Sequence, residues 1–189
     1  MKIAGARIDA TSKSHKIRRF VGVDISAPML EIARKNASAV TGTVDFVHAD
    51  ARDVGKIEKA IAKDTEIVVF CPLNTLGIFL ERDRPETISA MARLAGKNGV
   101  VLVSIFNAVG FEKNAYEIYA PVMPMVGKFD RKTALDLKTN TFHNGDYFSH
   151  WFLEDEIFRL VEKNLKATPL EGRELVVDKV GDIAILINI

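Results

Sequence analysis

The chain has 189 residues, of which 48% are hydrophobic and 27% charged, and its formal net charge is +1. This length and composition indicate one globular domain over residues 1–189 and exclude a disordered chain. The near-neutral charge gives no electrostatic basis for nucleic-acid binding, and no apolar run reaches the roughly 20 residues that cross a membrane. A single cysteine, Cys71, excludes an internal disulfide and a cysteine-rich zinc site. The N-terminus lacks the apolar stretch of a signal peptide, so we expect a cytoplasmic protein.

Strand-like and helix-like segments alternate through the first half of the chain. Pro28 suits the first turn of a helix and Ser26 is a suitable cap before it. The segments 66–70 and 100–106 are continuously apolar, which is typical of strands buried on both faces. We expect strands at 20–24, 44–48, 66–70 and 100–106, and helices at 28–39, 54–62 and 85–95. This alternation predicts an α/β fold, with a Rossmann-like, doubly wound and mostly parallel sheet.

The pattern changes over residues 107–151, which hold several glycines and prolines and most of the aromatic residues with polar tips. Residues 133–150 predict a β-hairpin that turns at Asn144-Gly145, because this dipeptide suits a two-residue turn. Residues 152–164 predict a helix, and 166–177 and 182–189 predict a C-terminal antiparallel hairpin.

Two apolar runs each end at a carboxylate, Asp24 in FVGVD and Asp50 in VDFVHAD. In a doubly wound sheet, ligands bind at the carboxyl ends of the strands. An acid after one strand can accept from both ribose hydroxyls, and an acid one βα unit later can accept from the adenine amine. The two acids therefore indicate a nucleoside site. The simpler interpretation is solvation of strand ends and capping of helices.

Several strings, taken in order, resemble the class I S-adenosylmethionine-dependent methyltransferases. VGVDIS with PMLEIARKN resembles that family's second strand and following helix, and VDFVHADARDV resembles its third strand and adenine-contacting acid. EIVVFCPLNTLGIF, GKNGVVLVSIFN and FLEDEIFRLVEKN resemble the fourth strand with its loop, the fifth strand, and the helix before the terminal hairpin. The resemblance runs from Phe20 to the C-terminus.

The resemblance implies S-adenosyl-L-methionine as the cofactor. Asp24 would then bind the ribose, Ile25 would pack on the adenine face, and Asp50 would accept from the adenine amine beside the Ala51 backbone. Phe70 and Cys71 would lie near the methionine part, and Asn74, with Thr75, near the transferred methyl group. The resemblance also implies that residues 107–151 are an inserted lid segment that binds the acceptor.

The family's glycine-rich loop is nearly absent, and only Gly5, in IAGAR, falls on an expected glycine position. Three accounts stay open: residues before Met1 are missing, the loop is degenerate, or another chain fills the gap. A missing central strand would leave backbone groups of its neighbours unpaired, which favours a homodimer or strand exchange.

The candidate acid–base residues are His143, Tyr147 and His150, in the segment expected to cover the acceptor. Their alternative interpretation is that the tyrosine is a hairpin or core aromatic and the histidines are surface residues. The histidines lack metal-ligand spacing, so we expect no metal. The segment CPLN differs from the Asn/Asp-Pro-Pro-aromatic motif of enzymes that methylate amide or base nitrogens.

Together these observations predict a methyltransferase that acts on a small molecule, with no membrane or nucleic-acid partner. A compact catalytic triad is not needed, because the methyl donor is already activated and the protein mainly positions the reactants. The alternative is a non-catalytic or truncated methyltransferase-like domain that acts as a binding or partner subunit. A nicotinamide-dependent oxidoreductase would also place an acid after its second strand, and it is a third hypothesis.

Overall fold

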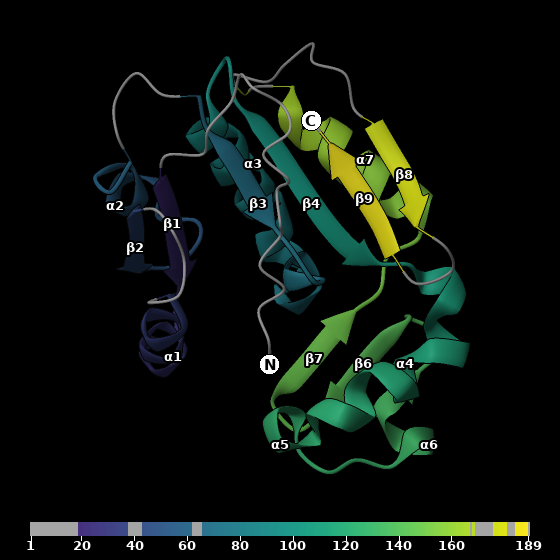
Figure 1. Cartoon of the computed structure of the whole chain (residues 1–189). Helices are drawn as coiled ribbons and strands as arrows, with labels where there is room; N and C mark the ends of the chain where they lie inside the picture. Colours follow the sequence, from purple (N-terminus) through teal and green to yellow (C-terminus); the bar gives the residue numbers. More distant parts are fainter. Residues whose placement is uncertain are drawn as a thin grey trace. The chain divides into compact units, whose positions relative to one another are not determined.

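The computed structural model describes residues 19–37, 43–61, 66–166, 168, 176–180 and 184–188. They belong to two compact units, residues 1–62 and 63–189, which we describe separately (Figure 1). Both units mix helices and strands, which confirms the predicted α/β class. Within the described residues, no helix is both long enough and apolar enough to cross a bilayer.

The first unit is a two-stranded parallel sheet with two helices. Strand β1 (Arg19–Asp24) pairs with β2 (Thr43–His48), so that Asp24 lies opposite His48. The helices are α1 (Ala27–Ala37) and α2 (Val54–Glu58). Both strands were predicted, but α2 ends earlier than the predicted 54–62 because its last turn tightens. The amides of Ala60 and Ile61 bond to carbonyls three residues back.

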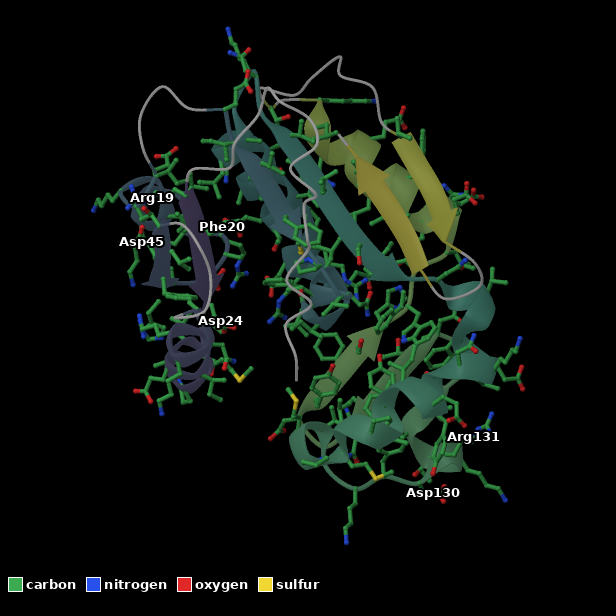
Figure 2. The ribbon with its side chains drawn as sticks, viewed as in Figure 1. Arg19, Phe20, Asp24, Asp45, Asp130 and Arg131 are labelled. Carbon is green, nitrogen blue, oxygen red and sulfur yellow. The ribbon has the colours of Figure 1, made fainter. Side chains whose placement is uncertain are left out.

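An ion pair joins β1 and β2 at the end of the sheet where both strands begin. The Arg19 Nε lies 2.7 Å from a carboxylate oxygen of Asp45, and both side chains are partly exposed. Figure 2 shows this pair at the opposite end of β1 from Asp24. The pair supports the register that brings the carboxyl ends of the two strands together.

The second unit contains a four-stranded sheet in the order β3-β4-β9-β8. Strands β3 (Val68–Cys71) and β4 (Val100–Phe106) are parallel, whereas β9 (Ala184–Asn188) and β8 (Val176–Val180) add in antiparallel fashion. The predicted C-terminal antiparallel hairpin is confirmed. Its first strand is β8 at Val176–Val180, where 166–177 was predicted, and residues 169–175 of that prediction lie outside the described residues.

Helices α3 (Arg84–Ala95) and α7 (Glu154–Leu165) lie against one face of this sheet (Figure 1). The side chains of Val101, Val103 and Ile105 on β4 point into this core and are at most 1% exposed. On β3, however, Val68 and Phe70 are 61% and 60% exposed. The prediction that β3 is buried on both faces is therefore wrong, because alternate side chains leave the helix-covered face.

Residues 107–151 form a separate antiparallel sheet of β5 (Leu135–Asp136), β6 (Thr141–Asn144) and β7 (Tyr147–His150). Around it lie α4 (Phe111–Tyr119), α5 (Met123–Val126) and α6 (Arg131–Ala134), and this part has its own largely aromatic core. Short 3₁₀ turns complete the unit: η1 (Thr75–Ile78), η2 (Glu81–Asp83), η3 (Ala108–Gly110) and η4 (Ala120–Val122).

The hairpin turn lies one residue later than predicted. Asn144 pairs with Tyr147, so the two turn residues are Gly145 and Asp146. Gly145 has a φ of 58°, a left-handed conformation that glycine adopts without strain. The Asn144 amide instead donates to the Val126 carbonyl at 2.6 Å, which ties the strand end to α5. Among the described residues the strands form three small sheets, and the doubly wound arrangement stays a prediction.

Candidate functional site

Asp24 is the last residue of β1 and lies at the start of the loop into α1 (Figure 2). Its Oδ1 accepts from the Ser26 amide at 2.8 Å, so one carboxylate oxygen shapes the loop. The other oxygen has no hydrogen bond from the residues that the structure describes. The Ile25 side chain beside it is 69% exposed. One carboxylate oxygen of Asp24 is therefore used within the loop before α1, and the exposed Ile25 side chain beside it is an apolar surface.

Asp50 lies beyond the carboxyl end of β2, next to the end of β1. The Ala49 amide donates to the Asp24 carbonyl at 3.1 Å, which joins the two strand ends. The Asp50 carboxylate is held by Arg52, whose Nε lies 2.9 Å from Oδ1 and whose Nη2 lies 2.7 Å from Oδ2. The Arg52 amide also donates to Oδ1 at 2.9 Å. The hydrogen bonds from Arg52 outweigh the effect of burial and lower the pKa of Asp50 to about 2.

This end of the sheet offers groups that suit an adenosine. Ribose hydroxyls and the adenine amine are hydrogen-bond donors, and the carboxylates of Asp24 and Asp50 are acceptors at neutral pH. The exposed Ile25 side chain is an apolar surface suited to a purine face. Ala51 is half-buried next to Asp50, whereas Gly5 lies outside the described residues.

The end of β3 and the loop after it hold the predicted residues of the methionine side, within the second unit. Phe70 is exposed and Cys71 is buried. Burial raises the pKa of the Cys71 thiol to about 11, so this cysteine is a buried apolar side chain and not a nucleophile. Leu73 and Asn74 have φ values of 55° and 59°, so the chain turns sharply here.

Asn74 joins this loop to β4 and β7. Its Nδ2 donates to the Ser149 Oγ and to the His150 carbonyl, both at 2.9 Å, and its Oδ1 accepts from the Phe106 amide at 3.0 Å. The side chain is only 1% exposed. In this structure Asn74 therefore positions the loop, and its predicted place near a transferred methyl group stays a prediction.

The three candidate acid–base residues lie on the β6–β7 hairpin but have different surroundings. His143 is exposed on β6. Tyr147 is half-buried on β7, and burial raises the pKa of its hydroxyl. The His150 side chain is 14% exposed, and its Nε2 lies 2.7 Å from a carboxylate oxygen of Glu156. Its Nδ1 lies 3.3 Å from the Thr141 Oγ1 on the neighbouring strand.

Glu156 belongs to a small charged cluster. The Arg84 Nη1 lies 3.8 Å from the same Glu156 oxygen that contacts His150, and the Arg84 guanidinium lies over the Phe152 ring, 5.0 Å from its centre. Burial alone would raise the pKa of Glu156, but the hydrogen bond and charge of His150, with weaker contributions from the Leu153 backbone and Arg84, lower it overall.

Four residues that were not predicted hold the candidate side chains in place. A signal existed for Arg52, two residues after an expected site acid, and for Glu156, in the first turn of the helix after His150. No local signal existed for Thr141 and Ser149, because their partners come from other elements.

The chain resembles proteins of one family and several solved structures. A family described as "Methyltransferase domain" matches residues 4–99, which is more than half of the chain. The match confirms the family resemblance seen in the sequence. No curated protein matches the chain.

Three solved structures illustrate the likeness in fold. The CcbJ methyltransferase from Streptomyces caelestis is 17% identical with a TM-score of 0.56, over 89% of this chain and 77% of that one. A SAM-dependent methyltransferase from Methanosarcina mazei is 15% identical with a TM-score of 0.54, over 90% and 80% of the two chains. A protein named as a Zn-dependent alcohol dehydrogenase from Rhodobacter sphaeroides is 14% identical with a TM-score of 0.50, over 89% and 73%. The fold alone therefore does not select a reaction, whereas the family match identifies a methyltransferase domain.

Proposed function

The chain belongs to the methyltransferase domain family, and we propose that it transfers a methyl group from S-adenosyl-L-methionine to a small-molecule acceptor. S-adenosyl-L-methionine is the cofactor of the family that the sequence resembles. The observation that carries the proposal is the pair of acids, Asp24 and Asp50, at the joined ends of β1 and β2 within the matched segment.

The cofactor supplies a methyl group on a positively charged sulfur, which makes the methyl carbon reactive towards a nucleophile. In the proposal, the second oxygen of Asp24 accepts from the ribose hydroxyls and Asp50 accepts from the adenine amine. Ile25 covers one face of the purine. The resemblance implies further contacts with the cofactor from Gly5, Ala51, Phe70, Cys71 and Asn74.

Of the three acid–base candidates, His150 has the surroundings that suit a base. If Nε2 carries the proton, the Nε2–H group donates a hydrogen bond to Glu156, and Nδ1 is left as the basic nitrogen. The Thr141 hydroxyl lies 3.3 Å from Nδ1, so an acceptor hydroxyl would take its place there when the acceptor binds. The base would take the proton of that hydroxyl as the methyl group is transferred.

In this proposal residues 107–151 are the acceptor-binding segment of a single doubly wound domain in the cytoplasm. The segment CPLN and the net charge of +1 favour a small molecule over a nucleic-acid base. The incomplete glycine-rich loop is the reason to include a homodimer in the proposal.

Calorimetric titration with S-adenosylhomocysteine tests the proposal directly. We expect micromolar binding by the chain and at least a tenfold loss in Asp24→Ala, because a carboxylate that accepts from both ribose hydroxyls contributes on the order of 2 kcal/mol. Asp45→Ala is the matched control, since Asp45 is an acid of the same sheet at the opposite end from Asp24.

Unchanged binding in Asp45→Ala together with loss in Asp24→Ala supports the nucleoside site. If the unmodified chain does not bind S-adenosylhomocysteine, this result contradicts the proposed enzymatic function and favours the non-catalytic alternative. Binding of a nicotinamide dinucleotide in place of S-adenosylhomocysteine would favour the oxidoreductase.

A further inference from the structure

Arg52 makes three hydrogen bonds to the carboxylate of Asp50. It donates from its backbone amide and Nε to Oδ1 of Asp50, and from Nη2 to Oδ2. The two side chains are 28% and 29% exposed, so the pair lies partly open to solvent where a ligand can reach it. We propose that Arg52 is a positioning residue that fixes the Asp50 carboxylate so that it selects a 6-amino purine over a 6-oxo purine. This inference rests on the proposed function.

The hydrogen bonds divide the two carboxylate oxygens into different roles. Each oxygen has two lone-pair directions. Oδ1 already accepts from two donors of Arg52, whereas Oδ2 accepts from one donor among the residues that the structure describes. Oδ2 therefore keeps an acceptor direction for an incoming N–H group, and the fork of Arg52 fixes where that direction points.

The chemistry of the pair decides which purine fits. Asp50 stays ionised beside the guanidinium and can only accept hydrogen bonds. The amine of an adenine donates to such an oxygen, whereas the carbonyl of a hypoxanthine would face it with another acceptor. A site whose acceptor matches a donor of the ligand strongly rejects a ligand that lacks this donor, because the acceptor of the site is then left without a hydrogen bond.

Arginine is required for this role because its contacts come from a planar fork. A lysine in its place keeps the charge but offers a single ammonium point, so the carboxylate could rotate about its own axis. Loss of orientation then weakens the discrimination between purines more than it weakens the fold. The Arg19–Asp45 pair of the same sheet provides a control, since it is an arginine–carboxylate pair at the opposite end.

The test measures the affinities of the full chain for S-adenosylhomocysteine and S-inosylhomocysteine by calorimetry. We expect the unmodified chain to prefer the adenosine compound by at least about tenfold. Arg52→Ala and Arg52→Lys should reduce that ratio of affinities to within about threefold, chiefly by weakening the binding of the adenosine compound. Arg19→Ala should leave the ratio unchanged, and circular dichroism spectra and melting curves check that each variant folds.

The outcomes separate this inference from the proposed function. A preference retained in both Arg52 variants overturns the inference, and so does tighter binding of S-adenosylhomocysteine in Arg52→Ala, which would mean that Arg52 competes with the adenine. In either case, loss of binding in Asp24→Ala still upholds the proposed cofactor. A chain that binds neither compound contradicts both.

Discussion

The carboxylate of Glu156 is held by two side chains from different elements. His150 comes from β7 and Arg84 from the start of α3, while Glu156 lies in the first turn of α7. The histidine contact is the shorter, at 2.7 Å compared with 3.8 Å. One residue therefore connects the proposed acceptor hairpin to the two helices that cover the main sheet.

The pKa of Glu156 predicts how this contact responds to acid. It lies below its ordinary value because the hydrogen bond and charge of His150, with the Leu153 backbone and Arg84, outweigh burial. A carboxyl group stabilises the fold when its pKa is lower in the folded than in the unfolded chain. This stabilisation is complete above the unfolded pKa, near 4.3, and is lost as the pH falls through the folded pKa. We expect Glu156→Gln to destabilise the protein at pH 7, with the difference from the unmodified chain shrinking below about pH 4.5.

Urea unfolding at pH 7, 5.5 and 4 measures this difference. Glu162→Gln is the control, since Glu162 is an exposed acid on the same helix. A difference between Glu156→Gln and the unmodified chain that stays constant over this range would show that the cluster does not stabilise the fold through its charge.

Cys71 should be nearly inert in the folded protein. Burial raises the pKa of its thiol to about 11, and the side chain is only 9% exposed. Since the thiolate is the reactive form, roughly 0.1% is present at pH 8, compared with about a quarter for an ordinary cysteine. We expect reaction with Ellman's reagent to be at least a hundredfold slower than for the same chain in 6 M guanidinium. Rapid reaction under native conditions would contradict the buried position.

At the scale of elements, Asn74 is the junction between the loop after β3 and the strands β4 and β7. Its side chain makes three hydrogen bonds, with Ser149, His150 and Phe106, and its backbone amide donates to the Ser104 carbonyl at 2.9 Å. The side-chain amide of Asn74 thus joins the loop after β3 to the hairpin that is proposed to bind the acceptor.

Asn74→Asp changes two hydrogen-bond donors into acceptors at nearly constant volume. The new carboxylate would face the Ser149 hydroxyl and the His150 carbonyl in a position that is 1% exposed. We expect a loss of about 2–4 kcal/mol in the free energy of unfolding, from the unmatched acceptors and the buried charge. Asn98→Asp is the control in an exposed turn, and a loss there as large as in Asn74→Asp would contradict the role of the amide.

The sequence predicted those elements that depend on nearby residues. Strands β1, β2 and β4 were located correctly because their apolar runs are bounded by local signals. The turn at Gly145 was placed one residue early, since an Asn-Gly pair does not say which of its residues enters the turn. The single-face burial of β3 depends on which helices cover the sheet, which a continuous apolar run does not reveal.

The candidate site was predictable only in part, for the same reason. Asp24 and Asp50 each follow a recognisable strand, so their common position at one end of the sheet followed from the topology. Asn74 and Ser149 are 75 residues apart, and their contact depends on how the hairpin meets β4. A pairing of this kind has no counterpart in the local sequence.

At the scale of the whole molecule, the two units differ greatly in the size of their cores. Among the described residues of the first unit, the buried apolar side chains are those of Leu30, Ala49 and Ile57. The second unit has two extensive clusters, one under the main sheet and one around Trp151. Buried apolar area is the main source of stability, so the first unit should open more readily than the second.

Hydrogen exchange followed by mass spectrometry tests this difference and links it to the cofactor. We expect peptides covering β1 and β2 to exchange faster than those covering β4, because few buried side chains hold the two-stranded sheet. A ligand that binds only the folded first unit stabilises that unit against opening. The stabilisation is about 2.7 kcal/mol at a ligand concentration a hundred times the dissociation constant. Saturating S-adenosylhomocysteine should therefore slow exchange in β1 and β2.

Asp24→Ala should abolish this protection and Asp45→Ala should keep it, because only Asp24 lies at the proposed ribose site. The aromatic cluster around Trp151 is an internal reference, since its core is built within residues 106–151. Equal protection in Asp24→Ala and the unmodified chain would mean that S-adenosylhomocysteine does not bind at the ends of β1 and β2. Slow exchange of β1 and β2 without any ligand would mean that the first unit is stabilised by more than the core that its described residues form.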